Sequence, residues 1–172
     1  MILGAVLAGG RASRFGSDKG AALFEGRALI DHSLTALGRH CQGLVVVGRD
    51  WPGVPSVSDR PAPDLGPLGG LAGALHYALA IGAERVLTLG CDTPLVPDTL
   101  LAELVARDTA VFLDGLPVIG IWPASLSPML DDFVATDPRR SMRGWAARCG
   151  AEALAAPPLP NINTPADLDR LG

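Results

Sequence analysis

The sequence is poor in lysine, cysteine and aromatic residues, and each shortage excludes a class of protein. Only Lys19 among the 14 basic residues is a lysine, and the formal net charge is −4. A broad basic face that would hold nucleic acid or an anionic membrane is therefore not expected. The three cysteines have no CxxC or CxxH spacing, and their odd number excludes a fully paired disulfide framework. No apolar run approaches the ~18 residues of a membrane span.

The composition that remains is typical of a globular protein, with 48% hydrophobic and 19% charged residues. The apolar run over residues 1–8 lacks a basic segment before it and a small-residue cleavage site after it, so it does not resemble a signal peptide. We expect one domain over residues 1–172, in a reducing cytoplasm, without nucleic acid or membrane among its partners.

Short apolar runs alternate with segments of helical periodicity, a pattern typical of parallel strands covered by crossover helices. The apolar runs predict strands at 2–7, 44–47, 86–89, 110–113, 118–122 and, more weakly, 152–154. The periodic segments predict helices at 28–37, 68–79, 97–106, 126–134 and 142–149, and a last one after Thr164. The predicted fold class is α/β: a three-layer α/β/α sandwich with a Rossmann-like, mostly parallel sheet. Ligands of such sheets bind outside the carboxyl ends of the strands.

A glycine-rich loop follows the first predicted strand, with the sequence LAGGRASRFGSDK over residues 7–19. Backbone N–H groups of small residues can approach an anion closely, and nearby Ser, Arg and Lys side chains add donors, which together suit a polyphosphate. The order of residues matches neither a Walker A loop nor GxGxxG. A simple turn with solvated arginines has the same pattern. Lys19 favours the phosphate site, because a compact ammonium and a planar guanidinium are not equivalent against phosphate.

Three other segments fall near predicted strand ends or helix starts. Asp92 follows a buried strand, where a carboxylate suits Mg²⁺ bridging to nucleotide phosphates, although a turn or N-cap role before Pro94 fits as well. The segment at 66–70, GPLGG, offers either free N–H groups to a ligand or close packing. Asn161 and Asn163 point the same way if extended, toward a ligand, or else serve the turn before Thr164.

Residues 7–19 resemble the LAGG-x-S-x-R-x-G-x-DK signature of the nucleotidyltransferases typified by molybdenum cofactor guanylyltransferase. Three further segments agree in order and spacing, over residues 2 to about 170: GPLGG at 66–70, CDTP at 91–94 and NINTPADL at 161–168. The resemblance implies a nucleotide-diphospho-sugar transferase fold and transfer of GMP from GTP to molybdenum-bound molybdopterin, with pyrophosphate released. It also implies other molybdenum cofactor proteins as partners.

The resemblance further implies a set of site residues. The residues implied to contact nucleotide or substrate are Leu7, Ala8, Gly9, Gly10, Lys19, Asp59, Gly66, Pro67, Leu68, Asp92, Asn161 and Asn163. Arg14, Lys19 and Asp92 are the implied catalytic residues, the first two as cationic clamps and Asp92 as the Mg²⁺ ligand. From the residues alone, Asp59 and Asp64 could not be distinguished, and the family spacing selects Asp59.

Two departures from the family pattern bear on substrate choice. Gly48-Arg49 stands where guanine-recognising members often carry Asn, and Leu116-Pro117 stands where many carry His-Pro. The sequence therefore leaves open CTP with molybdopterin, a nucleoside triphosphate with a sugar or alditol phosphate, and a nucleotide-binding regulatory protein without turnover.

Overall fold

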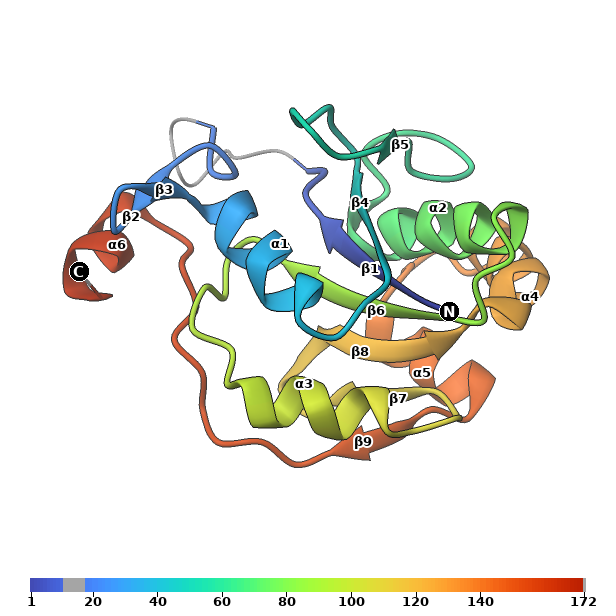
Figure 1. The fold of residues 1–172 in the computed structure, drawn as a ribbon. Helices are drawn as coiled ribbons and strands as arrows, with labels where there is room; N and C mark the ends of the chain where they lie inside the picture. The colour runs from blue at the N-terminus through green and yellow to red at the C-terminus, as the bar shows by residue number, and fades with distance from the viewer. Residues whose placement is uncertain (11–17, 172) are drawn as a thin grey trace.

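The computed structural model describes residues 1–10 and 18–171, and it contains a twisted seven-stranded sheet with helices on both faces (Figure 1). The strand order is β5-β4-β1-β6-β8-β7-β9. The strands are β1 (Ile2–Leu7), β4 (Gly43–Val47), β5 (Ser56–Val57), β6 (Arg85–Gly90), β7 (Val111–Leu113), β8 (Leu116–Pro123) and β9 (Glu152–Leu154). Only β8 runs antiparallel to its neighbours β6 and β7, so the sheet is mostly parallel. The predicted fold class is confirmed.

Helices cover the two faces in separate groups. The helices are α1 (Leu29–Gly38), α2 (Gly66–Ala80), α3 (Asp98–Val105), α4 (Ser127–Thr136), α5 (Met142–Cys149) and α6 (Pro165–Leu171), with a 3-10 turn, η1, at Ala124–Leu126. One core cluster joins α2, α4 and α5 to the sheet, and the other joins α1 and α3 to its opposite face. Figure 1 shows α1 and α3 on the near side of the sheet. None of the described helices is long and apolar enough to cross a membrane.

Strand β1 is an unbroken apolar run because it is buried on both faces of the sheet. Leu3, Ala5 and Leu7 belong to one core cluster, whereas Ile2 and Val6 belong to the other. Because successive side chains point to opposite faces, a strand buried on both faces must be apolar at every position. Parallel pairing with β4 on one edge and β6 on the other places β1 at the centre of the parallel half.

The structure also contains three short strands that the sequence did not predict. Strands β2 (Leu23–Phe24) and β3 (Arg27–Ala28) form a hairpin whose two-residue turn, Glu25-Gly26, has positive φ at both positions. The third is β5, which pairs with β4. Each has only two residues, too few for an alternating pattern to be recognised. The hairpin packs with α6 around a small cluster that includes Phe24 and Ile162.

The reversal of β8 follows from a short connection. Only Asp114 and Gly115 separate β7 from β8, and a two-residue turn can join antiparallel strands only. Gly115 has φ +88, which this turn requires and which glycine adopts without strain. The carboxyl ends of β1, β4 and β6 and the beginning of β8 consequently meet at one edge of the sheet.

Candidate active site

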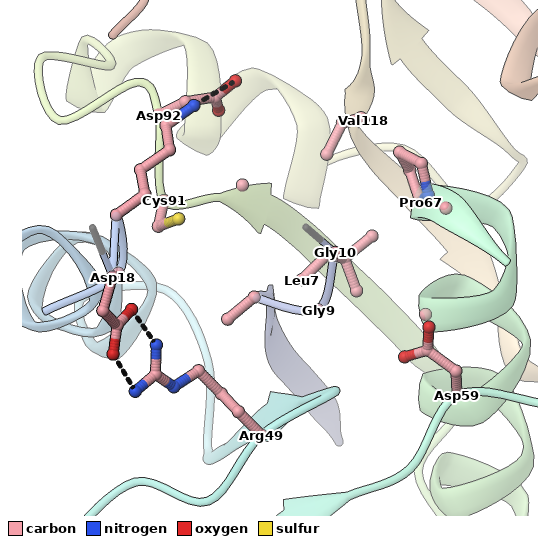
Figure 2. Close-up of a pocket in the computed structure, with 16 residues that line it drawn as sticks. Leu7, Gly9, Gly10, Asp18, Arg49, Asp59, Pro67, Cys91, Asp92 and Val118 are labelled. Atoms are coloured by element: carbon pink, nitrogen blue, oxygen red, sulfur yellow. Dashed lines mark hydrogen bonds and ion pairs between the residues drawn. The ribbon is translucent and has the colours of Figure 1, made fainter. Parts of the chain in front are cut away.

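A cavity of about 240 Å³ opens at this edge (Figure 2). It is lined by nine of the residues that the resemblance implied, namely Leu7, Ala8, Gly9, Gly10, Lys19, Asp59, Gly66, Pro67 and Asp92. Leu68 is fully buried in the core and does not line it. Arg14 lies outside the described residues. The segments after β1, β4 and β6 therefore converge on one hollow, as ligand sites of open α/β sheets do.

Lys19 and Asp92 face each other across part of this cavity. The Lys19 Nζ lies 3.9 Å from the Asp92 Oδ2, and both side chains are partly exposed. Gly90 leaves room for the carboxylate, because a Cβ there would lie 2.7 Å from the Asp92 Oδ1. A cation and a carboxylate side by side suit a phosphate group together with its metal ion.

The surroundings of Asp92 argue against a purely structural carboxylate. Helix α3 begins at Asp98, with Pro97 at its N-cap position, so Asp92 does not cap it. Among the described residues, no backbone N–H donates to the carboxylate, and its one hydrogen bond comes from the Thr93 hydroxyl at 3.4 Å. The described residues contain no group of three or more His, Cys, Asp or Glu suited to a metal. A carboxylate with so few protein partners suits Mg²⁺, which usually binds one or two carboxylates plus substrate phosphates.

Asp59 lies on the other side of the cavity from Asp92 (Figure 2). The residue is 7% exposed, and within the described residues its Oδ1 is buried without a hydrogen-bond partner. Burial, and secondarily the charge of Asp64, raise the pKa of Asp59 above its ordinary value. A buried acceptor without a partner costs free energy unless a ligand supplies donors. Asp64 is exposed and lines the second cavity described below, not this one.

The glycines of α2 divide into two groups with different roles. Gly66 and Pro67 line the cavity, and no side chain in the described part of the chain caps this helix N-terminus. Gly69 accepts a hydrogen bond from the Arg60 backbone N–H at 3.0 Å. A Cβ on Gly73 would lie 2.2 Å from the Ser58 carbonyl oxygen. The glycine-rich start of α2 thus allows the segment that carries Asp59 to lie directly against the helix.

The main chain is equally close at the end of β4. Gly48 has φ +91, and a Cβ there would lie 2.5 Å from the Gly9 Cα. No side chain fits at position 48 with this backbone. A second cavity of about 270 Å³ opens beside it, and Gly9, Gly10, Arg49 and Asp59 line both cavities.

Asn161 and Asn163 occupy different environments, and neither lines the cavity. The Asn161 Oδ1 is buried, with no hydrogen-bond partner in the described part of the chain, whereas Asn163 is exposed. The backbone N–H groups of Asn163 and Thr164 both donate to the Asp167 carboxylate at 2.9 Å, which is the turn chemistry of a helix start. Between the two asparagines, the Ile162 N–H donates to the Asp92 carbonyl at 2.6 Å, so this segment lies against the Asp92 loop.

Sequence reasoning missed an ion pair at the edge of the site. Arg49, after β4, donates two hydrogen bonds to the carboxylate of Asp18, and both residues line the cavity (Figure 2). The residues are 31 positions apart, which no local pattern connects. Cys91 and Val118 also line the cavity and were not predicted.

Comparison with known proteins identifies the family. The model of the MobA-like NTP transferase domain matches residues 4–153. A molybdenum cofactor guanylyltransferase from Rhizobium leguminosarum bv. trifolii is 34% identical, with 97% of this chain and 90% of the relative covered. Molybdopterin-guanine dinucleotide biosynthesis protein A from Archaeoglobus fulgidus has a TM-score of 0.77 at 21% identity, over 99% of this chain and 96% of that one.

The same fold also occurs in a CMP:2-keto-3-deoxy-manno-octonic acid synthetase solved with CTP. Its TM-score is 0.69 at 13% identity, with 99% of this chain and 95% of that chain covered. These structural likenesses show the fold alone, and the sequence matches show the family. On the match over residues 4–153 and the identity along nearly its whole length, this chain belongs to the MobA-like NTP transferase family.

Proposed function

We propose that the chain transfers GMP from GTP to the terminal phosphate of molybdenum-bound molybdopterin and releases pyrophosphate. The observation that carries the proposal is the pairing of Lys19 with Asp92 beside the Gly9-Gly10 backbone, in the cavity at the strand ends. The guanylyltransferase activity named for the relative from Rhizobium supports the choice of substrates.

The reaction needs no side chain to remove a proton from the nucleophile, because the acceptor phosphate is already an anion. A phosphate oxygen of the acceptor forms a bond to the α-phosphorus of GTP, and the bond from that phosphorus to the β-phosphate oxygen breaks. Catalysis consists of holding the two substrates in line and neutralising the charge that grows on the leaving pyrophosphate. Lys19 supplies a positive charge there, and the N–H groups at Gly9 and Gly10 bind phosphate oxygens. Arg14 is proposed as a second cation.

Asp92 is the proposed ligand for Mg²⁺. When bound, the ion neutralises charge on phosphate oxygens. Asp92 would hold the ion, and its Oδ2 lies 3.9 Å from the Lys19 ammonium, so the two residues would supply positive charge in the same part of the cavity. We assign Leu7, Ala8, Gly66, Pro67, Leu68, Asn161 and Asn163 supporting contacts to the substrates, as the family pattern implies.

The buried oxygen of Asp59 favours guanine as the base. Guanine presents an N1–H and an N2 amine side by side, which can both donate to one carboxylate, whereas cytosine presents only its N4 amine on that edge. Asp59 lines both cavities, and its buried Oδ1 has no hydrogen-bond partner in the described part of the protein. The family's Asn has no counterpart at Gly48, where a side chain would overlap Gly9. Asp59 is therefore the side chain that we assign to the base.

The decisive experiment compares pyrophosphate release from GTP, CTP, ATP and UTP in the presence of molybdenum-bound molybdopterin and Mg²⁺. We expect release with GTP and little with the others. Release with CTP alone would overturn the guanylyl assignment. Nucleotide binding without any pyrophosphate would instead favour a regulatory protein. We place the reaction in the cytoplasm and expect its protein partners among other molybdenum cofactor proteins.

A further inference from the structure

Arg49 is held on two sides at the border between the two cavities. Its guanidinium donates two hydrogen bonds to Asp18, and the distance from Nη2 to Oδ2 is 2.6 Å. Its Cζ lies 5.3 Å from the centre of the Trp51 ring, in a cation–π arrangement. The Trp51 Nε1 in turn donates to the Asp31 carboxylate of α1 at 2.8 Å. The arginine is thus fixed to β4 and α1, which are rigid parts of the fold.

Asp18 belongs to the turn that carries Lys19. This turn is attached to α1 on one side, where the Ile30 N–H donates to the Gly20 carbonyl at 3.2 Å. On the other side its attachment is the pair between Asp18 and Arg49. The packing is tight, because a Cβ on Gly20 would lie 2.7 Å from the Ile30 Cδ1 and 3.1 Å from the Arg49 Nη1. The turn is therefore held between the helix and the end of β4.

Within the described residues, the Lys19 ammonium has no comparably close contact of its own. Its distance of 3.9 Å from the Asp92 Oδ2 exceeds that of a hydrogen bond. A lysine side chain has a flexible four-carbon stem, so the position of its charge depends strongly on the backbone from which it starts. The backbone of residues 18–20 therefore determines which phosphate the ammonium can reach.

We propose that Asp18 and Arg49 are a positioning pair, which fixes the turn at residues 18–20 so that the Lys19 ammonium faces the nucleotide phosphates next to Asp92. The inference rests on the proposed function and adds two residues that act through Lys19. Hydrogen bonds from Arg49 lower the pKa of Asp18, and those to Asp18 raise the pKa of Arg49, so both groups remain charged near neutral pH.

The rival explanation is that Arg49 binds the nucleotide directly. Double-mutant cycles distinguish the two explanations. The variants are Asp18→Asn, Arg49→Met and their double variant, each made in the native chain and in the Lys19→Met background. Turnover is measured as pyrophosphate release, and affinity for GTP with Mg²⁺ is measured by calorimetry. Arg143→Met, which removes an exposed ion pair to Asp114 at 3.4 Å, is the control for loss of an arginine charge.

We expect Asp18→Asn and Arg49→Met each to lower kcat by roughly 10- to 100-fold, since a misplacement of about 1 Å can cost 10²-fold. The kcat of the double variant should match that of the less active single variant within about twofold, because the two residues form one unit. In the Lys19→Met background both substitutions should change kcat by no more than about twofold. A merely structural pair would lower activity in both backgrounds alike.

Multiplicative losses in the double variant, or an undiminished effect of Arg49→Met in the Lys19→Met background, would overturn the proposal. Thermal unfolding of every variant identifies those that do not fold, and Asp18→Glu and Arg49→Lys then replace them in the cycle. Should the native chain release no pyrophosphate from any nucleotide, the proposed function fails. The coupling between Asp18, Arg49 and Lys19 is then evaluated from the affinity for whichever nucleoside triphosphate the native chain binds. Failure of the proposed function is thereby distinguished from failure of the positioning pair.

Discussion

The two halves of the sheet use their carboxyl-end loops in opposite ways. In the half made by β1, β4 and β6, main chains approach each other without intervening side chains, and charged groups surround the cavity. In the half made by β7, β8 and β9, a third cavity of about 360 Å³ is lined mainly by apolar groups, among them Leu113, Leu116 and Leu159, with Asp114 as its one charged residue. The charged chemistry of the site is concentrated in the parallel half.

The difference indicates how this fold separates tasks. Glycines at 9, 48 and 73 cannot gain a side chain without displacing backbone or a carboxylate, so the nucleotide half tolerates little change. The antiparallel half has a comparable contact, because a Cβ on Gly120 would lie 2.7 Å from the Val111 carbonyl oxygen, but neither residue lines any of the three cavities. Elsewhere this half depends on side-chain packing, with Trp122 fully buried. Substitutions in the first half should therefore act on catalysis, and those in the second on stability.

The largest effect on catalysis is expected from Asp92→Ala. Without the carboxylate, Mg²⁺ loses the protein ligand that we assign to it, and transfer should fall by roughly 10³-fold or more. The measurement is pyrophosphate release across a Mg²⁺ titration, with Asp98→Ala as control, since Asp98 lies on the exposed start of α3 and pairs with His40. Activity retained at all Mg²⁺ concentrations would place the metal elsewhere.

Replacing Lys19 by arginine keeps the charge but changes its shape. We expect kcat to fall by roughly 10²-fold, because a planar fork cannot reproduce the contact of a compact ammonium. Arg39→Lys makes the reverse exchange at an exposed position, where Nη1 lies 3.8 Å from the Asp98 Oδ1, and should leave kcat unchanged. A native rate for Lys19→Arg would contradict the role assigned to the single lysine.

A smaller, pH-dependent effect is expected from Asp59→Asn. The carboxylate is the form that accepts from guanine, so affinity for GTP in the native chain should fall as pH drops through the raised pKa of Asp59. Asp59→Asn should bind GTP roughly 10-fold more weakly or worse and lose this pH dependence, since a hydrogen bond to a charged group contributes about 1.5–3 kcal/mol. Calorimetry from acidic to neutral pH measures both the affinity and its pH dependence. Asp132→Asn, at an exposed position on α4, is the control for loss of a carboxylate.

The same residue makes a signed prediction for stability. Because burial raises the folded-state pKa of Asp59, ionised Asp59 opposes folding at neutral pH, and this cost disappears as pH falls through the raised value. The free energy of unfolding of the native chain, relative to Asp59→Asn, should therefore increase toward acid. Chemical unfolding at several pH values measures it, and a decrease toward acid would contradict the burial of the charge.

The smallest effect on catalysis is expected from Leu130→Ala on α4, the helix that follows β8 in the chain. Leu130 is fully buried in the core cluster that α4 shares with α2 and does not line the active-site cavity, so the free energy of unfolding should fall by roughly 2–5 kcal/mol. Pyrophosphate release at a temperature where the variant is folded should match the native rate. A large fall in kcat under those conditions would contradict the proposal that substitutions outside the nucleotide half act on stability and not on catalysis.

The strands, helices and motifs that depend on local sequence pattern could be predicted from the sequence. Every predicted strand and helix is present, and α5 has the predicted bounds, because Ser141 caps its start and Gly150, at φ +72, ends it. The glycine loop was recognised because its glycines and basic residues are close together in the sequence. Asp92 was recognised because it follows a predicted strand directly. Strand β5 and the β2–β3 hairpin were too short to detect. The pair between Asp18 and Arg49 depends on how β4 lies beside the first loop, which no local pattern contains. The single-domain boundary and the roles of the site residues stay predictions.

The contact between Gly48 and Gly9 has a consequence for how this chain could change its nucleotide. An asparagine at position 48 would need the two main chains to separate first, so no single substitution at this site can restore the family's side chain. We therefore expect selection for a different base to act on the wall formed by Asp59, Pro63 and Asp64, which line the second cavity. A library directed at that wall, with position 48 left as glycine, is the shorter route to a variant with altered base preference.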